Sequence, residues 1–511
     1  MHTNEATGAL WSKFSAFIAE TMGLHFPPER WGDLQRGLVN AAQELGQEDV
    51  AGWAEALMAA SPDKARLDLL AGHLTIGETY FFRDKATFDA LGERILPELI
   101  QARRSRERRL RLWSAACCTG EEAYSIAMLL HELLPDLKEW HVTILATDIN
   151  PRFLRKAATG VYGEWSFRAT PSWVRDRFCM PVPDGRHAVR PEVKRMVTFA
   201  SLNLVDDVYP SLASDTNAMD VIFCRNVLMY FATPQVRRVV GRLHRTLVEG
   251  GWLVVSPSEA SHALFGQFGA VNAPGVILYR KSLSCGTTVQ SSAAHPWETP
   301  WEPSALTLDA SAPALEELVP AVRREEPEPD VEVEVKERGE PMAEQRAPHE
   351  IASALYEQGR YAEAVECLLA ATAGRAPAPE EFALLARALA NQGRLDEALK
   401  WCDRWIAAEK LDAVARYLRA IVLFEQGTAA EAWRSLSEAL YLRPDFILAH
   451  VAFGQASRAR GHPREARRHF TNALRLLARC ERDESVPESD GLSAGRLSEM
   501  ITTLLKTDPM S

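Results

Sequence analysis

The sequence lacks any run of about 18 apolar residues, so no membrane-spanning helix is expected. Its first residues, MHTNEATGALWSK, lack the basic-then-apolar order of a secretory signal peptide. Its eight cysteines form no C-x-x-C pair, which argues against a zinc site or a disulfide framework. These absences indicate a protein of the reduced cytoplasm that has no metal site and does not insert into a membrane.

An excess of basic charge is also missing. The formal net charge is −11, which does not suggest a nucleic-acid-binding role. Hydrophobic residues make up 47% of the chain and charged residues 25%, the balance of a soluble globular protein. The length of 511 residues is enough for about two to four domains.

The first 282 residues predict two domains. Residues 1–90 show helical spacing, as in Trp11, Phe14, Phe17 and Ile18, and predict an all-α domain. Residues 91–282 alternate apolar strands with helical patterns, which predicts an α/β domain with a mostly parallel sheet covered on both faces. The expected strands are 109–116, 141–148, 219–226, 250–257 and 275–281. Residues 165–200 differ in pattern and predict a small antiparallel β insert with a hairpin at Asp184-Gly185.

The remainder divides into a linker, a repeat region and a tail. Residues 283–347 are rich in Ser, Pro and Glu and cannot bury enough apolar surface to fold, so we expect an acidic linker. Residues 348–480 repeat with a period of 34, because Gly359, Gly393, Gly427 and Gly461 are evenly spaced. The period, the glycine and the Glu-Ala that follows it resemble the tetratricopeptide (TPR) repeat, an α-helical solenoid. Residues 481–511 predict a loose tail with a final short helix.

The segment LWSAACCTGEEAYSIAMLL (112–130) carries the clearest chemistry. It predicts a strand, a tight turn of small residues and a helix that opens on Glu121-Glu122. The turn is not G-x-G-x-x-G, and carboxylates would repel a phosphate but would suit an amine. Asp148 ends the next strand, where a carboxylate is placed to accept hydrogen bonds from a ribose. S-adenosylmethionine has a ribose, an amino-acid tail and no phosphate; the alternative is that Asp148 only caps the following helix.

Several segments in order resemble the CheR family of chemotaxis-receptor methyltransferases. They are LTIGETYFFRD (74–84), SAACCTGEEAYSIAM, ATDIN, VTFASLNL (197–204) and MDVIFCRNVLMYF (219–231). The resemblance extends over residues 10–282. It implies a Rossmann-like methyltransferase fold and the methylation of receptor glutamates with S-adenosylmethionine, which leaves S-adenosylhomocysteine as product.

The resemblance also implies roles for single residues. Thr79 and Arg83 would contact the methionyl end of the cofactor, and Glu122, with Glu121, would hold its amino group. Asp148 would bind the ribose, Asn203 and Leu204 would line the adenine, and Arg225 and Asn226 would shape the floor near the sulfonium. Tyr230, with Arg225, would act at the incoming substrate carboxylate. Arg83 could instead pair with a carboxylate near Asp84, and Tyr230 could be a core residue.

The sequence departs from the family at three places. Gly77 stands at a cofactor position where asparagine is usual, Ala123 replaces a proline, and Ser256-Pro257-Ser258-Glu259 replaces Gly-His-Ser-Glu. These changes leave a second interpretation open: a scaffold or adaptor with a weak or inactive methyltransferase domain. A third keeps the enzyme and changes its substrate to another protein or a small molecule.

The family's substrates imply the partners. The cytoplasmic coiled coil of a chemoreceptor would dock on the β insert, and a basic surface would steer it. The six arginines of ARRSRERRLR (102–111), with Arg30 and Arg36, are candidates for that surface, or they form an ordinary solvated face. The linker segment HPWETPWE (295–302) could mimic a receptor tether, and the repeats would recruit a further protein.

Overall fold

The computed structural model describes residues 2–59, 63–105, 108–170, 172–211, 214–282, 347–489 and 491–506. The expected linker, with its segment HPWETPWE (295–302), lies outside these residues except for Ala347. Within the described part of the chain, no helix is both long enough and apolar enough to cross a membrane.

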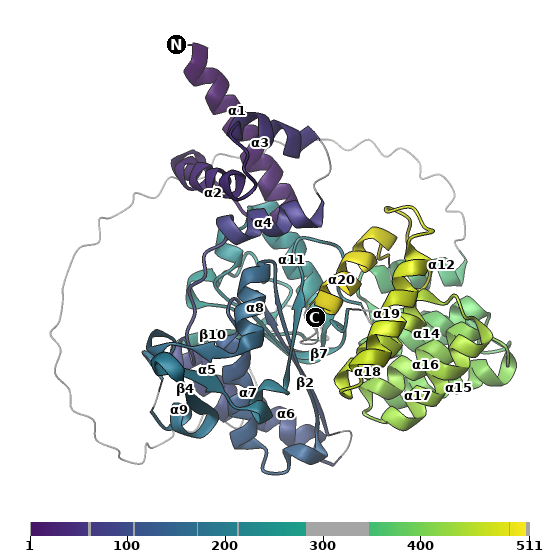
Figure 1. The fold of residues 1–511 in the computed structure, drawn as a ribbon. Coiled ribbons are helices and arrows are strands. Elements are labelled where there is room, and N and C mark those ends of the chain that lie inside the picture. Colours follow the sequence, from purple (N-terminus) through teal and green to yellow (C-terminus); the bar gives the residue numbers. More distant parts are fainter. Residues whose placement is uncertain are drawn as a thin grey trace, which may run out of the picture. The chain divides into compact units, whose positions relative to one another are not determined.

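Four helices form the N-terminal domain, as the helical spacing predicts (Figure 1). They are α1 (His2–Met22), α2 (Trp31–Glu44), α3 (Val50–Ala59) and α4 (Lys64–Leu74). Phe14, Ile18 and Leu38 are fully buried in the core that these helices share. The side chain of Asp63 accepts a hydrogen bond from the Arg66 amide and so begins α4. The polypeptide then enters the α/β domain through the segment after Leu74.

A seven-stranded sheet forms the centre of the α/β domain, in the order β6-β2-β1-β7-β8-β10-β9. Its strands are β1 (Arg109–Ala115), β2 (His141–Asp148), β6 (Val197–Ser201), β7 (Met219–Cys224), β8 (Leu247–Val254), β9 (Gly269–Ala273) and β10 (Val276–Arg280). The first five in the sheet order pair in parallel, and β10 is antiparallel to β8 and β9. The α/β fold class predicted from the sequence is therefore confirmed.

Both faces of this sheet are buried. Leu112 and Val221 point to one face, which packs on α5 (Lys85–Ala90), α6 (Leu96–Arg103) and α7 (Glu121–Leu133). Their neighbours Trp113 and Ile222 point to the other face, which packs on α11 (Thr233–Thr246). Alternate residues of one strand thus lie in two separate cores, which explains why apolar residues occupy neighbouring positions in these strands.

The β insert is present, but its limits differ from the expected ones. A three-stranded antiparallel sheet consists of β3 (Val161–Tyr162), β4 (Cys179–Val182) and β5 (Arg186–Val189). Asp184 and Gly185 form the hairpin turn with φ of 67° and 69°, as predicted. The segment 197–200 was expected inside the insert, which is wrong, because it belongs to strand β6 at the edge of the main sheet.

The repeat region forms helical hairpins at the predicted 34-residue spacing. They are α12 (Pro348–Glu357) with α13 (Tyr361–Ala371), α14 (Pro379–Asn391) with α15 (Leu395–Ala408), α16 (Ala413–Glu425) with α17 (Ala429–Leu442), and α18 (Ile447–Ala459) with α19 (Pro463–Leu477). Each hairpin turns at one of the four periodic glycines, whose φ angles lie between 74° and 81°. A residue with a side chain is strained at such an angle, which explains the glycine at each turn.

The described tail residues, 481–489 and 491–506, pack against the repeat helices, so the prediction of a loose tail is wrong for them, whereas the expected final short helix is present. Val486 and Leu492 are 4% and 1% exposed, and they join the core of the repeat helices. The Val486 amide donates to the Leu492 carbonyl, and Arg387 of α14 pairs with Glu488. The helix α20 (Ala494–Lys506) follows and buries Ile501 completely. The described tail therefore packs as part of the repeat region.

Candidate cofactor and active site

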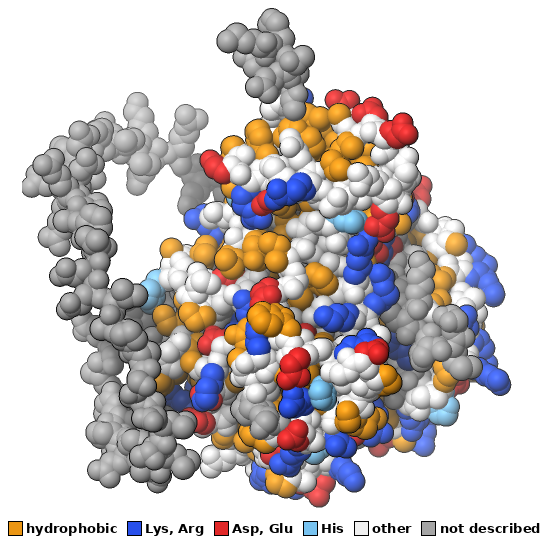
Figure 2. Space-filling view, turned by 60° about the vertical axis from the view of Figure 1, so that its left-hand side comes forward, with side chains coloured by type: hydrophobic (Ala, Val, Ile, Leu, Met, Phe, Trp, Pro, Cys, Tyr) orange, Lys and Arg blue, Asp and Glu red, His pale blue; other side chains and the backbone are white. Residues whose placement is uncertain are grey.

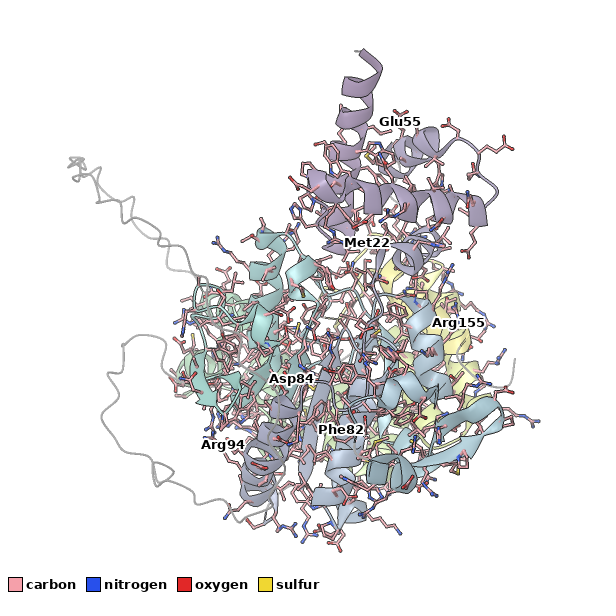
Figure 3. The ribbon with its side chains drawn as sticks, turned by 90° about the vertical axis from the view of Figure 1, so that its left-hand side faces the viewer. Met22, Glu55, Phe82, Asp84, Arg94 and Arg155 are labelled. Atoms are coloured by element: carbon pink, nitrogen blue, oxygen red, sulfur yellow. The ribbon has the colours of Figure 1, made fainter. Side chains whose placement is uncertain are left out.

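One cavity lies beyond the carboxyl ends of β1, β2 and β7, where ligands of parallel sheets bind. It has a volume of about 1030 Å³ and is open to solvent. Helix α1 closes one side through Met22, which is labelled in Figure 3. The cavity brings together most residues that the sequence singled out: Thr79, Arg83, Glu122, Asp148, Asn203, Leu204, Arg225, Asn226 and Tyr230.

The turn between β1 and α7 brings its backbone to the cavity. Ala116, Cys118 and Gly120 have φ angles of 65°, 50° and 93°, so the backbone turns back on itself within five residues. A Cβ at Gly120 would lie 2.8 Å from the Ala157 side chain, which leaves no room for a larger residue. Burial raises the pKa of the Cys118 thiol to about 12, so this cysteine is a neutral small residue of the turn.

Asp148 is held by backbone amides at the end of β2. Its Oδ2 accepts a hydrogen bond of 2.8 Å from the Cys118 amide, and its Oδ1 accepts one of 2.8 Å from the Asn150 amide. Burial raises the pKa of the carboxyl to about 6, although these hydrogen bonds oppose the shift. The cap of α8 (Pro151–Thr159) is Asn150, whose side chain accepts from the Arg152 amide. The helix-capping interpretation of Asp148 is therefore wrong, and its carboxylate remains at the cavity.

Glu122 and Arg225 form an ion pair at the floor of the cavity. Arg225 Nη1 lies 3.1 Å from Glu122 Oε2, and its Nη2 lies 3.3 Å from Asp84 Oδ2. The other Glu122 oxygen accepts a hydrogen bond of 2.7 Å from the Ser114 hydroxyl. The Arg225 side chain is only 3% exposed, so it is fixed between two carboxylates. Asp84, labelled in Figure 3, thus connects the segment after the N-terminal domain to the end of β7.

Glu121 lies away from the cavity. Its carboxylate accepts hydrogen bonds from Thr119 (2.6 Å) and Ser166 (3.0 Å), and its side chain is 1% exposed. It joins the turn to the 164–167 segment, which lies between β3 and β4 of the insert. The cavity lining includes Glu122 and leaves Glu121 out, so the two neighbouring carboxylates have different surroundings.

Arg83 offers a positive charge at the cavity wall. Its guanidinium donates to the Glu78 carbonyl, and no described carboxylate forms an ion pair with it. The alternative pairing near Asp84 is not observed, because Asp84 accepts from Arg225 and from the Thr87 hydroxyl. The charge of Arg83 is therefore available for an anion.

Asn203 and Tyr230 join the cavity to the N-terminal domain. Asn203 Nδ2 donates to the Thr21 carbonyl at 2.8 Å and to Asp206 Oδ1 at 2.9 Å. The carbonyl of Tyr230 accepts from the His25 amide at 2.7 Å, and its ring packs on the helical core of that domain. Tyr230 lines the cavity and is partly exposed there, so it is not an ordinary core residue.

Gly77 is outside the cavity lining, and Phe153 lies against it. A Cβ at Gly77 would lie 2.6 Å from Phe153 Cζ, so the ring occupies the space that a side chain at position 77 would need. Sequence reasoning missed Phe153, and it also missed His25 and Phe26, which line the cavity from the N-terminal domain. Arg30 lines the cavity as well, although the sequence suggested it only for a basic docking surface. The aromatic residue three positions after ATDIN was the available signal for Phe153.

The arginine run 102–111 lies at the other end of β1. The strand begins at Arg109, and its seven residues span about 23 Å before the cavity begins. Arg103, Arg104, Arg108 and Arg111 pair with the carboxylates of Asp220, Asp136, Glu139 and Asp215. Figure 2 shows basic and acidic side chains spread over one face of the molecule. The structure therefore gives the run a role in the sheet and its helices. Of the other two candidates, Arg30 lines the cavity and Arg36 pairs with Asp33, and steering of a partner stays a prediction.

The polar groups that line the cavity carry charge of both signs. They are three arginines (Arg30, Arg83 and Arg225), three carboxylates (Glu78, Glu122 and Asp148) and two asparagines (Asn203 and Asn226), and apolar side chains form the rest of the wall. Among the described residues, no group of three or more His, Cys, Asp or Glu side chains is placed to hold a metal ion. The described polar groups are therefore suited to hold an organic ligand through charge and hydrogen bonds.

Comparisons with known proteins agree with this geometry. Residues 77–276 match the family model of the CheR methyltransferase, SAM binding domain. Chemotaxis protein methyltransferase 1 of Pseudomonas aeruginosa is 34% identical over 284 residues, which is 54% of this chain and 98% of that protein. Chemotaxis protein methyltransferase Cher2 of Pseudomonas putida is 32% identical over 283 residues, which is 54% of this chain and all of that protein.

A third relative covers the repeat region as well. The probable biofilm formation methyltransferase WspC of Pseudomonas putida is 28% identical over 476 residues, which is 92% of this chain and 99% of that protein. The two shorter relatives are covered almost completely at more than 30% identity. The chain therefore belongs to the CheR family of methyltransferases.

Proposed function

We propose that this protein is a protein-glutamate O-methyltransferase that uses S-adenosylmethionine to methylate glutamate side chains of chemoreceptors. The observation that carries the proposal is the cavity at the carboxyl ends of β1, β2 and β7. It places Arg83, Glu122 and Asp148 around one space, where each would contact a different part of an amino-acid-bearing nucleoside.

The residues of the cavity fit this methyl donor. Arg83 has no described carboxylate partner and would bind the ligand carboxylate as a fork of donors. Glu122 would accept from the amine, since each of its oxygens can accept more than one hydrogen bond. Asp148 would accept from the ribose, and Asn203 and Leu204 would lie beside the adenine. The left-handed turn at Ala116 to Gly120 lets the backbone approach.

The site needs no general base. Bound S-adenosylmethionine supplies a methyl group on a positively charged sulfur. A substrate glutamate is already ionised near pH 7, so the protein does not have to remove a proton from it. Tyr230 would orient the incoming carboxylate through its hydroxyl, and the Arg225 guanidinium keeps the floor in place from between Glu122 and Asp84. Alignment of this kind can lower a barrier by about 7–11 kcal/mol.

The partners follow from the same proposal. The substrate would be the cytoplasmic coiled coil of a chemoreceptor, docked on the β insert that lies next to the cavity turn. The helical hairpins from α12 to α19 would recruit a further protein, in the manner of tetratricopeptide arrays. The probable biofilm formation methyltransferase WspC aligns with 92% of this chain, which supports a common role for the methyltransferase domain and the hairpins in one protein.

A scaffold with an inactive methyltransferase domain is the competing proposal, and Gly77 is the observation that favours it. Calorimetry with S-adenosylhomocysteine separates the two, because a scaffold would show no binding. Transfer of a tritiated methyl group to membranes that carry receptors, followed by base-labile release of methanol, then tests for a glutamyl ester. Transfer without base-labile methanol would show a methyltransferase with another acceptor.

A further inference from the structure

Glu259 is a buried carboxylate whose role the cavity residues do not explain. It ends the short turn η7 (Pro257–Glu259) that follows β8, and it is 7% exposed. No described Lys, Arg or His side chain pairs with it, although a buried carboxylate without a cation is costly. Its charge must therefore be offset by hydrogen bonds.

Three backbone amides of one segment, residues 226–229, donate hydrogen bonds that offset the charge of Glu259. Glu259 Oε2 accepts from the Asn226 amide at 2.7 Å, and Oε1 accepts from the Val227 amide at 2.7 Å and the Met229 amide at 3.2 Å. Oε2 also accepts from the Ser256 amide at 3.2 Å and from the Ser256 hydroxyl. The carboxylate thus takes the place that a bound anion has in a nest of backbone amides.

The segment that donates these amides lines the cavity. Arg225, Asn226, Val227 and Tyr230 all face it, immediately after β7. Asn226 has a φ of 56°, an uncommon angle for a residue with a side chain, so the segment needs support to keep its shape. Within the segment, the Tyr230 amide donates to the Val227 carbonyl at 3.1 Å. The other amides named above depend on Glu259.

We propose that Glu259 is a positioning residue: it fixes the loop 226–230 and thereby places Tyr230 opposite the methyl donor. The carboxylate joins the ends of the neighbouring strands β7 and β8, which fixes the loop to the sheet. The proposal rests on the proposed function for its activity readout, whereas the hydrogen bonds can be tested without any substrate.

The test is the variant Glu259→Gln in the full chain. In glutamine, an NH₂ group replaces one of the two carboxylate oxygens. This group cannot accept the hydrogen bonds that the backbone N–H groups now donate to that oxygen, so one end of the loop loses its support. We expect kcat for receptor methylation to fall at least tenfold, with the Kd for S-adenosylhomocysteine changed less than threefold. Ser258→Ala is the matched control, because Ser258 is on the same turn and bonds only to the Ser256 hydroxyl. It should keep wild-type kcat.

A second measurement does not depend on activity or on the folding of a variant. Hydrogen exchange in the wild-type protein should show protected amides at residues 226, 227 and 229, although they lie beside an open cavity. Rapid exchange at these amides would overturn the proposal, as would a Glu259→Gln variant with wild-type kcat. An inactive wild-type protein with protected amides would instead contradict the proposed function and leave the positioning role intact.

Discussion

The ring of Phe153 lies directly over the Cα of Gly77, with 2.6 Å between Phe153 Cζ and the place where a Cβ would be. Phe153 lines the cavity and Gly77 does not. The Phe153 ring from α8 therefore fills the space that a side chain at position 77 would occupy. This relationship explains how a CheR-family site can keep its cavity without the asparagine usual at this position.

Restoring the asparagine should damage the site. Gly77→Asn would place a Cβ within 2.6–2.8 Å of two Phe153 ring atoms, so the ring has to move. We expect about tenfold weaker binding of S-adenosylhomocysteine by calorimetry, and substantial recovery in the double variant Gly77→Asn/Phe153→Val. Gly163→Asn is the control, because a Cβ there meets nothing within 4 Å. Equal affinity in the single and double variants would show that the two positions are not coupled.

Cofactor binding should weaken in acid because of Asp148. Burial raises its pKa to about 6, so the carboxylate that would accept from the ribose becomes protonated below that pH. The Kd for S-adenosylhomocysteine should rise about tenfold between pH 7 and pH 5, because at pH 5 the pH is about one unit below the pKa of Asp148 and most of its carboxylate is protonated. Asp148→Asn should bind weakly with little pH dependence. A wild-type profile that persists in this variant would assign the effect to a group other than Asp148.

The unliganded protein should show the opposite trend in stability. The folded-state pKa of Asp148 lies above its ordinary value, so the folded protein binds more protons than the unfolded chain between about pH 4 and pH 6. Its contribution to the free energy of unfolding is therefore most favourable in acid and is lost as the pH rises through 6. The difference in melting temperature between wild type and Asp148→Asn, followed from pH 7 to pH 5, measures this contribution. A melting temperature of the wild type that rises relative to that of Asp148→Asn as the pH increases from 5 to 7 would contradict the pKa shift.

The central strands could be predicted because both of their faces are buried. Leu112 and Trp113 lie in different cores, so apolar residues follow one another along the strand. The edge strands gave no such signal. In β9 no residue is buried, and in β6 only Val197 is. Apolar content along the sequence therefore finds the middle of the sheet and misses its edges.

The residue types of the site could be predicted, but their directions could not. Glu121 and Glu122 are adjacent and identical in type, and the rotation of about 100° per residue in α7 directs only Glu122 to the cavity. Ser166, which holds Glu121, is 45 residues away. The arginines of 102–111 are likewise paired by carboxylates from distant segments. These contacts depend on the folded chain, and no local pattern predicts them.

Tyr230→Phe should separate catalysis from binding. The hydroxyl of Tyr230 has no described hydrogen-bond partner and the residue lines the cavity, so it is free to contact a substrate carboxylate. Its ring packs on the N-terminal domain, and phenylalanine keeps that packing. We expect methyl transfer to receptor membranes to fall about 10–100-fold, because a hydrogen bond to a charged group contributes roughly 1.5–3 kcal/mol. Calorimetry with S-adenosylhomocysteine should give an unchanged Kd, and equal loss of both would remove Tyr230 from the catalytic role.

The packed tail makes a prediction about stability. Ile501 of α20 is completely buried with the repeat helices, so Ile501→Ala removes apolar contacts and leaves a cavity. Substitutions of this kind cost about 2–5 kcal/mol. Leu411→Ala is the matched control, because Leu411 is in the same region and is 81% exposed. Urea unfolding followed by far-UV circular dichroism should show an earlier transition only for Ile501→Ala. Equal midpoints for the two variants would mean that the tail is loose, as its composition alone had indicated.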